Sequence, residues 1–199
     1  MSILNQKTIN KKISFRGVGL HTGNQVELNL LPSAPNTGIT FKRTDLKNNN
    51  IVIPTFDNVV DTSFCTTLSN EHGVKVSTIE HLMGALYGLG IDNLLVEINA
   101  QELPILDGSA KLFIEKILSS GIKSSSIPIK LIKVNKKIFY EEGSKFISLD
   151  KSKVSSEIDF EIKYKNPLIG KQRNKVNIFN DDLKNIFESR TFCLYEDVE

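Results

Sequence analysis

The chain has 199 residues, of which 40% are hydrophobic and 24% are charged, so it can bury one large or two small cores and general disorder is excluded. A formal net charge of +2 is too close to neutral to indicate a nucleic-acid-binding protein. No run of about 18 apolar residues is present, which excludes a membrane-spanning helix in this sequence.

In chain order, the first half predicts strands interleaved with two helices. Val26, Leu28 and Leu30 alternate with polar residues, which is typical of a half-buried strand. Further strands are predicted at 38–43, 51–53 and 94–98, and helices at 78–88 and after Ser109, which can cap the second helix.

The helix at 78–88 has two different sides. Ser77 followed by Glu80 predicts a capping box at its start, and Gly88 and Gly90 predict its end. One side is apolar, whereas His81, Gly84 and Gly88 share the other. Because this second side carries nothing charged or long, we expect it also to be covered, with Glu80 and His81 at the exposed N-terminal end.

The second half predicts mostly strands. Residues 123–128, rich in serine and ending at a proline, suit a linker. After it we expect strands at 129–140 and 145–149 joined as a hairpin, and a strand at 158–164. A short helix at 183–187 and a strand at 190–194 should follow. We therefore predict an α+β fold of two similar small domains, at 1–122 and 129–199. The second domain is incomplete, as expected of a fragment.

Glu80 and His81 are the leading candidates for chemistry, since adjacent carboxylate and imidazole groups can supply a proton acceptor and a metal ligand. Structural roles, as a capping residue and a hydrogen-bonded interface histidine, stay open for them. The pair lacks the second histidine of the zincin pattern. His21 lies in a glycine-rich bend and Asp107 at a strand-to-helix corner, and either can also be structural. Cys65 and Cys193 are far apart, which predicts reduced thiols in a cytoplasmic protein.

Five motifs, in order and at matching intervals, resemble the UDP-3-O-acyl-N-acetylglucosamine deacetylase family, the zinc hydrolases that commit bacteria to lipid A synthesis. The resemblance covers the chain from about residue 5 to its last residue. The motifs are Gly17-Val18-Gly19-Leu20-His21-Thr22-Gly23, Ser77-Thr78-Ile79-Glu80-His81-Leu82, Gly90-Ile91-Asp92-Asn93, Pro104-Ile105-Leu106-Asp107-Gly108-Ser109 and Arg190-Thr191-Phe192.

The resemblance implies two α+β domains, each a β-sheet layered with helices, whose helix layers meet at the active site. It implies that His81 is a ligand of one Zn²⁺ and that Glu80 is the general base, while Thr191 stabilises the oxyanion. The implied substrate is a small molecule, an acylated UDP-amino sugar. The remaining implied roles are lining the substrate pocket (Phe64, Cys65, Phe192) and supporting the site (His21, Asp107).

The family's other two zinc ligands and its general acid have no matching position within residues 1–199. A catalytic zinc site normally has three protein ligands. We therefore expect the 199-residue chain alone to be inactive and to bind zinc weakly. A second hypothesis is a truncated, non-catalytic homologue that binds the UDP-sugar or a protein partner.

Overall fold

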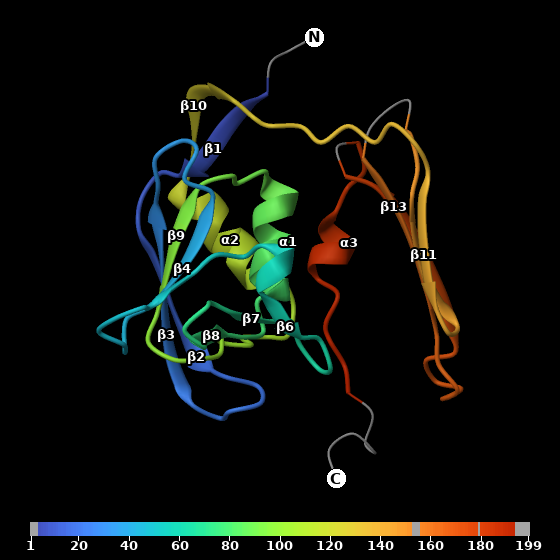
Figure 1. Ribbon diagram of the computed structural model, residues 1–199, viewed down its shortest axis with the longest axis horizontal. Coiled ribbons are helices and arrows are strands. Elements are labelled where there is room, and N and C mark those ends of the chain that lie inside the picture. Colours follow the sequence, from blue (N-terminus) through green and yellow to red (C-terminus); the bar gives the residue numbers. More distant parts are fainter. Residues whose placement is uncertain (1–3, 153–155, 179, 194–199) are drawn as a thin grey trace. The chain divides into compact units, whose positions relative to one another are not determined.

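The computed structural model describes residues 4–152, 156–178 and 180–193, and it is shown in Figure 1. The chain divides into two compact units. The first comprises the described residues up to Ile129 together with those from Lys184 onward, and the second is Lys130–Leu183. The structure contains helices as well as several β-sheets, which confirms the predicted α+β class.

The main sheet of the first unit has five strands in the order β2-β3-β9-β4-β5. All neighbours are antiparallel except the parallel pair β4 and β9. Alternate residues of β3 face the core, so the strand predicted there is confirmed. The bounds are β2 (Ile13–Val18), β3 (Gln25–Pro32), β4 (Ile39–Arg43), β5 (Ile51–Val52) and β9 (Leu94–Ile98).

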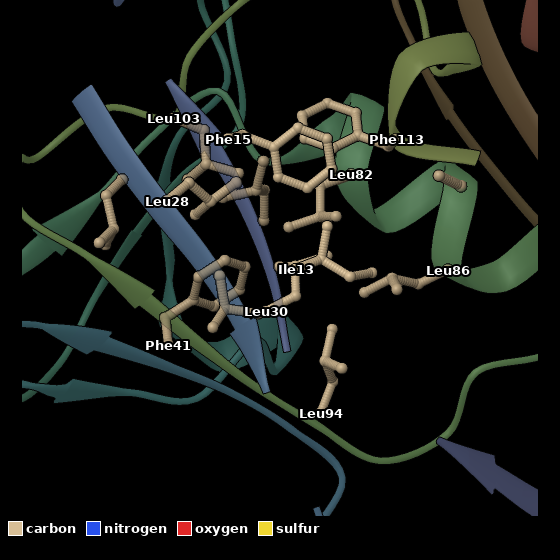
Figure 2. Close-up of a cluster of buried hydrophobic side chains, with 14 of the residues drawn as sticks. Ile13, Phe15, Leu28, Leu30, Phe41, Leu82, Leu86, Leu94, Leu103 and Phe113 are labelled. Atoms are coloured by element: carbon tan, nitrogen blue, oxygen red, sulfur yellow. The ribbon is translucent and has the colours of Figure 1, made fainter. Parts of the chain in front are cut away.

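Two ten-residue helices, α1 (Glu80–Leu89) and α2 (Lys111–Ser120), pack with this sheet around one hydrophobic core. Figure 2 shows side chains from strands and helices meeting in that core. Leu82 and Leu86 of α1 are at most 1% exposed, and burying each such side chain contributes about 1.5–3 kcal/mol. The rings of Phe15 on β2 and Phe113 on α2 lie 5.0 Å apart. The core thus fixes both helices on the sheet.

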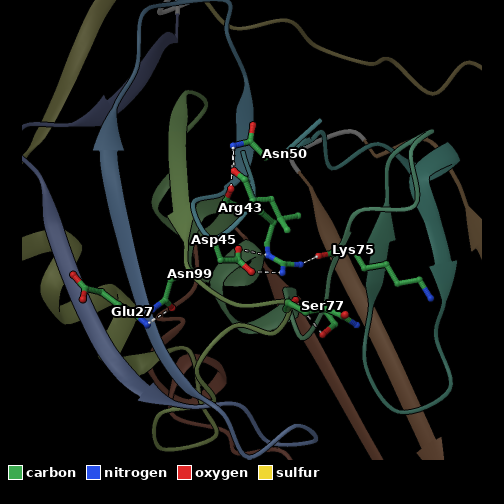
Figure 3. A network of polar contacts seen from close by, with 9 residues as sticks. Glu27, Arg43, Asp45, Asn50, Lys75, Ser77 and Asn99 are labelled. Atoms are coloured by element: carbon green, nitrogen blue, oxygen red, sulfur yellow. Dashed lines mark hydrogen bonds and ion pairs between the residues drawn. The ribbon is translucent and has the colours of Figure 1, made fainter. Parts of the chain in front are cut away.

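A small sheet leads into α1. Its strands are β6 (Val59–Asp61), which follows the short 3-10 helix η1 (Phe56–Asn58), β7 (Thr67–Ser69) and β8 (Lys75–Val76). The buried guanidinium of Arg43, on β4, forms two hydrogen bonds with the Asp45 carboxylate and donates a third to the Lys75 carbonyl oxygen at 2.8 Å (Figure 3). Hydrogen bonds from Arg43 lower the pKa of Asp45. The main sheet is therefore tied to the strand just before α1.

The predicted linker at 123–128 is wrong. These residues belong to β10 (Ile122–Pro128), which pairs antiparallel with β1 (Asn5–Ile9). Ile9, opposite Ile122, is fully buried. Serine-rich composition indicates a loop only when the backbone groups have no strand to pair with, and here the partner comes from more than 100 residues away.

The second unit consists of two hairpins. The predicted hairpin at 138–149 is confirmed as β11 (Ile138–Glu142) and β12 (Lys145–Leu149), although the first strand begins later than residue 129. The predicted strand at 158–164 is confirmed as β13 (Glu157–Lys163), paired with β14 (Lys171–Asn177). Three cross-strand ion pairs line one face of this second hairpin.

The segment after Leu183 departs from the predicted domain division. The short helix is present as α3 (Lys184–Phe187), but it groups with the first unit, not with residues 130–183. The strand predicted at 190–194 is absent from Arg190–Cys193, and Leu194 lies outside the described residues. Within the described ranges, no helix combines the length and the hydropathy needed to cross a membrane.

Candidate active site

The start of α1 is held by backbone pairing, and the predicted capping box is wrong. Ser77 is buried, donates its N–H to the Gln101 carbonyl oxygen at 2.9 Å and accepts the N–H of Leu103 at 3.1 Å. Its side chain makes no cap, and Ile79 occupies the N-cap position. The end of the helix is as predicted, because Gly90 adopts φ +66°, in the left-handed region that glycine favours.

Glu80 is exposed at the first turn of α1, and its carboxylate accepts the backbone N–H of Thr66 at 3.2 Å. This hydrogen bond joins Glu80 to the β6–β7 connection, which carries Phe64 and Cys65. The Phe64 ring is 74% exposed and lies 6.4 Å from the ring of His21. The β6–β7 connection therefore lies against Glu80 through Thr66 and near His21 through Phe64.

His81, next to Glu80, is half-buried on α1. In the parts of the chain that the structure describes, no group of three or more His, Cys, Asp or Glu side chains could hold a metal ion. His72 is in an exposed turn beside Glu71. Because a catalytic Zn²⁺ normally has three protein ligands, these residues do not by themselves fit that ion.

A second group of predicted site residues lies at the start of α2. The Asp107 carboxylate accepts the Ser109 hydroxyl at 2.8 Å, and the Ser109 oxygen in turn accepts the Lys111 N–H at 3.1 Å. Ser109 therefore contacts the first residue of α2, but the predicted N-cap at Ser109 is wrong, because Ala110 occupies that position and no side chain caps the helix. Burial raises the pKa of Asp107, but the hydrogen bonds from Ser109 and the charge of Arg190 outweigh it, so the net shift is downward.

Thr191 is docked on this same corner. Its backbone N–H donates to the Gly108 carbonyl oxygen at 2.9 Å, and the preceding Arg190 lies 3.8 Å from the Asp107 carboxylate. Glu188 forms an ion pair with Lys111 at 3.0 Å. The Thr191 side chain is exposed, and the neighbouring Phe192 ring is 50% exposed. The segment therefore presents Thr191 beside the start of α2, without the predicted strand.

One residue that sequence reasoning missed connects the two groups. Glu102 is fully buried and accepts hydrogen bonds from His21, Thr22 and Thr78. The chain runs on from Glu102 to Asp107, and the Ile105 N–H donates to the Val18 carbonyl oxygen at 3.0 Å. The sequence feature that could have indicated this role of Glu102 is its position as a single acidic residue just before the apolar run that starts at Leu103.

The sequence model of the family described as LpxC, UDP-3-O-acyl N-acetylglycosamine deacetylase, matches residues 6–199. The chain belongs to this deacetylase family. The match covers both units and includes all eight predicted site residues.

Several curated relatives carry the name UDP-3-O-acyl-N-acetylglucosamine deacetylase. The relative from Histophilus somni is 43% identical over 201 residues, and that from Pasteurella multocida is 42% identical over the same length. The relative from Shewanella oneidensis is 40% identical over 197 residues. These alignments cover 98–99% of this chain and 64–65% of each relative, so the chain spans less than two thirds of these deacetylases.

Proposed function

We propose that this chain supplies catalytic residues for hydrolysis of the N-acetyl group of UDP-3-O-acyl-N-acetylglucosamine, giving UDP-3-O-acyl-glucosamine and acetate. This is the committed step of lipid A biosynthesis in the family that the motifs resemble. The observation that carries the proposal is the Glu80 carboxylate, exposed beside His81 and oriented by the Thr66 N–H at 3.2 Å. The relatives are named as deacetylases, which favours an enzyme over a non-catalytic binding module.

Glu80 accepts a proton from the attacking water, whose oxygen adds to the acetamide carbonyl carbon. The Thr191 hydroxyl donates a hydrogen bond to the oxyanion that develops on the former carbonyl oxygen. Collapse of this intermediate breaks the C–N bond, and the leaving amine takes a proton from a general acid. The resemblance assigns that acid to a histidine that has no counterpart within residues 1–199.

The proposal includes one Zn²⁺ per active site with His81 among its ligands. Such a site needs ligands beyond those that the described residues bring together. Phe64, Cys65 and Phe192 line the path of the substrate, and His21 and Asp107 support the site. The cytoplasmic location stays a prediction that rests on the two separated cysteines, and the layered two-domain arrangement stays one that rests on the resemblance.

The test is acetate release from the UDP-sugar by a protein of the relatives' full length that contains residues 1–199, called the full-length protein below. Glu80→Ala and His81→Ala should each lower kcat by at least about 10²-fold, as expected for loss of a general base or a metal ligand. Glu71→Ala, in the exposed turn beside His72, is the control and should leave kcat unchanged. Wild-type rates in both α1 variants would refute the assignment.

A further inference from the structure

Glu102 is a carboxylate with no solvent exposure and four hydrogen-bond donors. One oxygen accepts the His21 N–H and the Thr78 hydroxyl, each at 3.0 Å. The other accepts the N–H and the hydroxyl of Thr22, each at 2.8 Å. Burial raises the pKa of Glu102, but these hydrogen bonds outweigh it and the net shift is downward. Removing a donor from a buried carboxylate of this kind lowers the stability of the folded state, because the charge is then incompletely hydrogen-bonded.

On one side, the carboxylate closes the loop that carries His21. A Cβ on Gly19 would lie 2.5 Å from both Oε2 of Glu102 and Oγ1 of Thr22. Only glycine lets the backbone come this close, so the loop is shaped around the carboxylate. His21 is thereby held through its backbone while its ring remains near Phe64.

On the other side, the carboxylate holds the residue from which α1 departs. Thr78 has φ +56°, a left-handed conformation that a β-branched residue rarely adopts. Such a conformation costs about 1–3 kcal/mol and persists only where its surroundings impose it. Here the Thr78 hydroxyl donates to Glu102, and Ser77 pairs with the backbone on either side of Glu102. Since Glu80 is two residues later, the conformation of Thr78 sets the direction in which Glu80 and His81 project.

We propose that Glu102 is a positioning residue, which holds the His21 loop and the N-terminal end of α1 in one fixed arrangement. Its effect on catalysis rests on the function proposed above, whereas its effect on geometry does not. No chemistry passes through Glu102 itself. It acts through Thr78 on Glu80 and through the backbone on His21.

Amide hydrogen exchange and imidazole resonances, measured by NMR on the 199-residue chain, test the geometry. The Thr66 amide reports where the Glu80 carboxylate lies, and the His21 and Thr22 amides report the loop. His72 is an internal reference for the imidazole signals of His21 and His81. Thr78→Val removes only the hydroxyl donor, and Thr78→Ser keeps it. Glu102→Gln is matched by Glu97→Gln, a carboxylate on β9 that pairs with Lys42.

In Glu102→Gln we expect exchange of the His21 and Thr22 amides to accelerate by at least about tenfold, since hydrogen bonds to a charged group are lost. In Thr78→Val the Thr66 amide should accelerate and the His81 signals should shift. Thr78→Ser and Glu97→Gln should resemble wild type, and the His72 signals should stay constant. If Thr78→Val and Thr78→Ser gave the same imidazole spectra and the same amide exchange rates, the proposal would be overturned. This comparison does not depend on whether Glu102→Gln folds.

The catalytic arm uses the full-length protein. Thr78→Val should lower kcat with little change in KM, and Thr78→Ser should restore it. If the wild-type protein releases no acetate, the proposed function fails while the NMR comparison still decides the positioning role. If the wild type is active and Thr78→Val keeps full kcat, the positioning role in catalysis is wrong.

Discussion

The ring of Phe187 occupies the space that a side chain on Gly88 would need. A Cβ built on Gly88 of α1 would collide with the end of this ring, whereas nothing lies within 4 Å of such an atom on Gly84, one turn earlier. Phe187 is half-buried and packs against the core cluster. The expected covering of this side of α1 is therefore present at Gly88, by the segment that leads to Thr191, and wrong at Gly84, which is exposed.

Gly84→Ala and Gly88→Ala should consequently have opposite effects on stability. The first removes a helix glycine in open space and should stabilise the protein by up to about 1 kcal/mol. The second forces the Phe187 ring away, and overpacking of this kind costs about 1–3 kcal/mol. Denaturant unfolding of both variants checks this. Equal free energies of unfolding would show that Phe187 does not pack on α1.

Residues 1–199 alone should bind Zn²⁺ weakly and should not deacetylate the UDP-sugar, because the described residues bring only one of the ligands assigned by resemblance to the site. Calorimetric titration of the apo chain with Zn²⁺ and an acetate-release assay with and without chelator check both statements. Stoichiometric, tight binding that His81→Ala abolishes and His72→Ala preserves would contradict the first. Chelator-sensitive acetate release would contradict the second.

Thr191→Val in the full-length protein should lower kcat by about 10²-fold to 10³-fold, the usual effect of removing one oxyanion donor. Thr191→Ser, which keeps the hydroxyl, should retain most of the activity. Both variants keep the backbone hydrogen bond to Gly108, so the segment should stay docked on Asp107 and Gly108. The rates are compared at saturating substrate. Equal rates for the valine and serine variants would remove Thr191 from the mechanism.

The stability provided by Glu102 should depend on pH. Its folded-state pKa lies below the ordinary value of 4.5, so the folded state favours the ionised carboxylate. The contribution is present above about pH 4.5 and is lost as pH falls through the folded-state pKa. Glu102→Gln should therefore destabilise the protein by about 2–4 kcal/mol at neutral pH, and by less as the pH drops toward about 3. Unfolding curves across this range check the trend. A difference that grows with acidity would contradict it.

Local patterns sufficed for much of the fold. Apolar alternation identified β3 and β13, and helical periodicity together with Gly90 identified α1. For β3 and α1 these signals work because burial on one face of a strand or helix repeats with its own geometry. The alternation in β13 repeats with the same strand period, although its apolar residues Ile158 and Phe160 are exposed. The motif order likewise indicated the family and marked Glu80, His81 and Thr191. The pairing of β1 with β10 left no comparable trace, since a strand partner more than 100 residues away does not alter local composition.

The sequence by itself determined the two longer helices, several strands such as β3 and β9, and the candidate side chains for chemistry, because these follow from residue type and spacing. It did not determine β10, which needs a distant partner, and it predicted a strand at 190–194 that Arg190–Cys193 do not form. Only the tertiary structure decided how those side chains are held. Ser77 is in a backbone ladder and does not cap α1, and the segment ending in Thr191 is docked on the start of α2. Glu102 became recognisable only once folding had removed it from water and surrounded it with donors from two distant segments, since a carboxylate acquires that role from its partners.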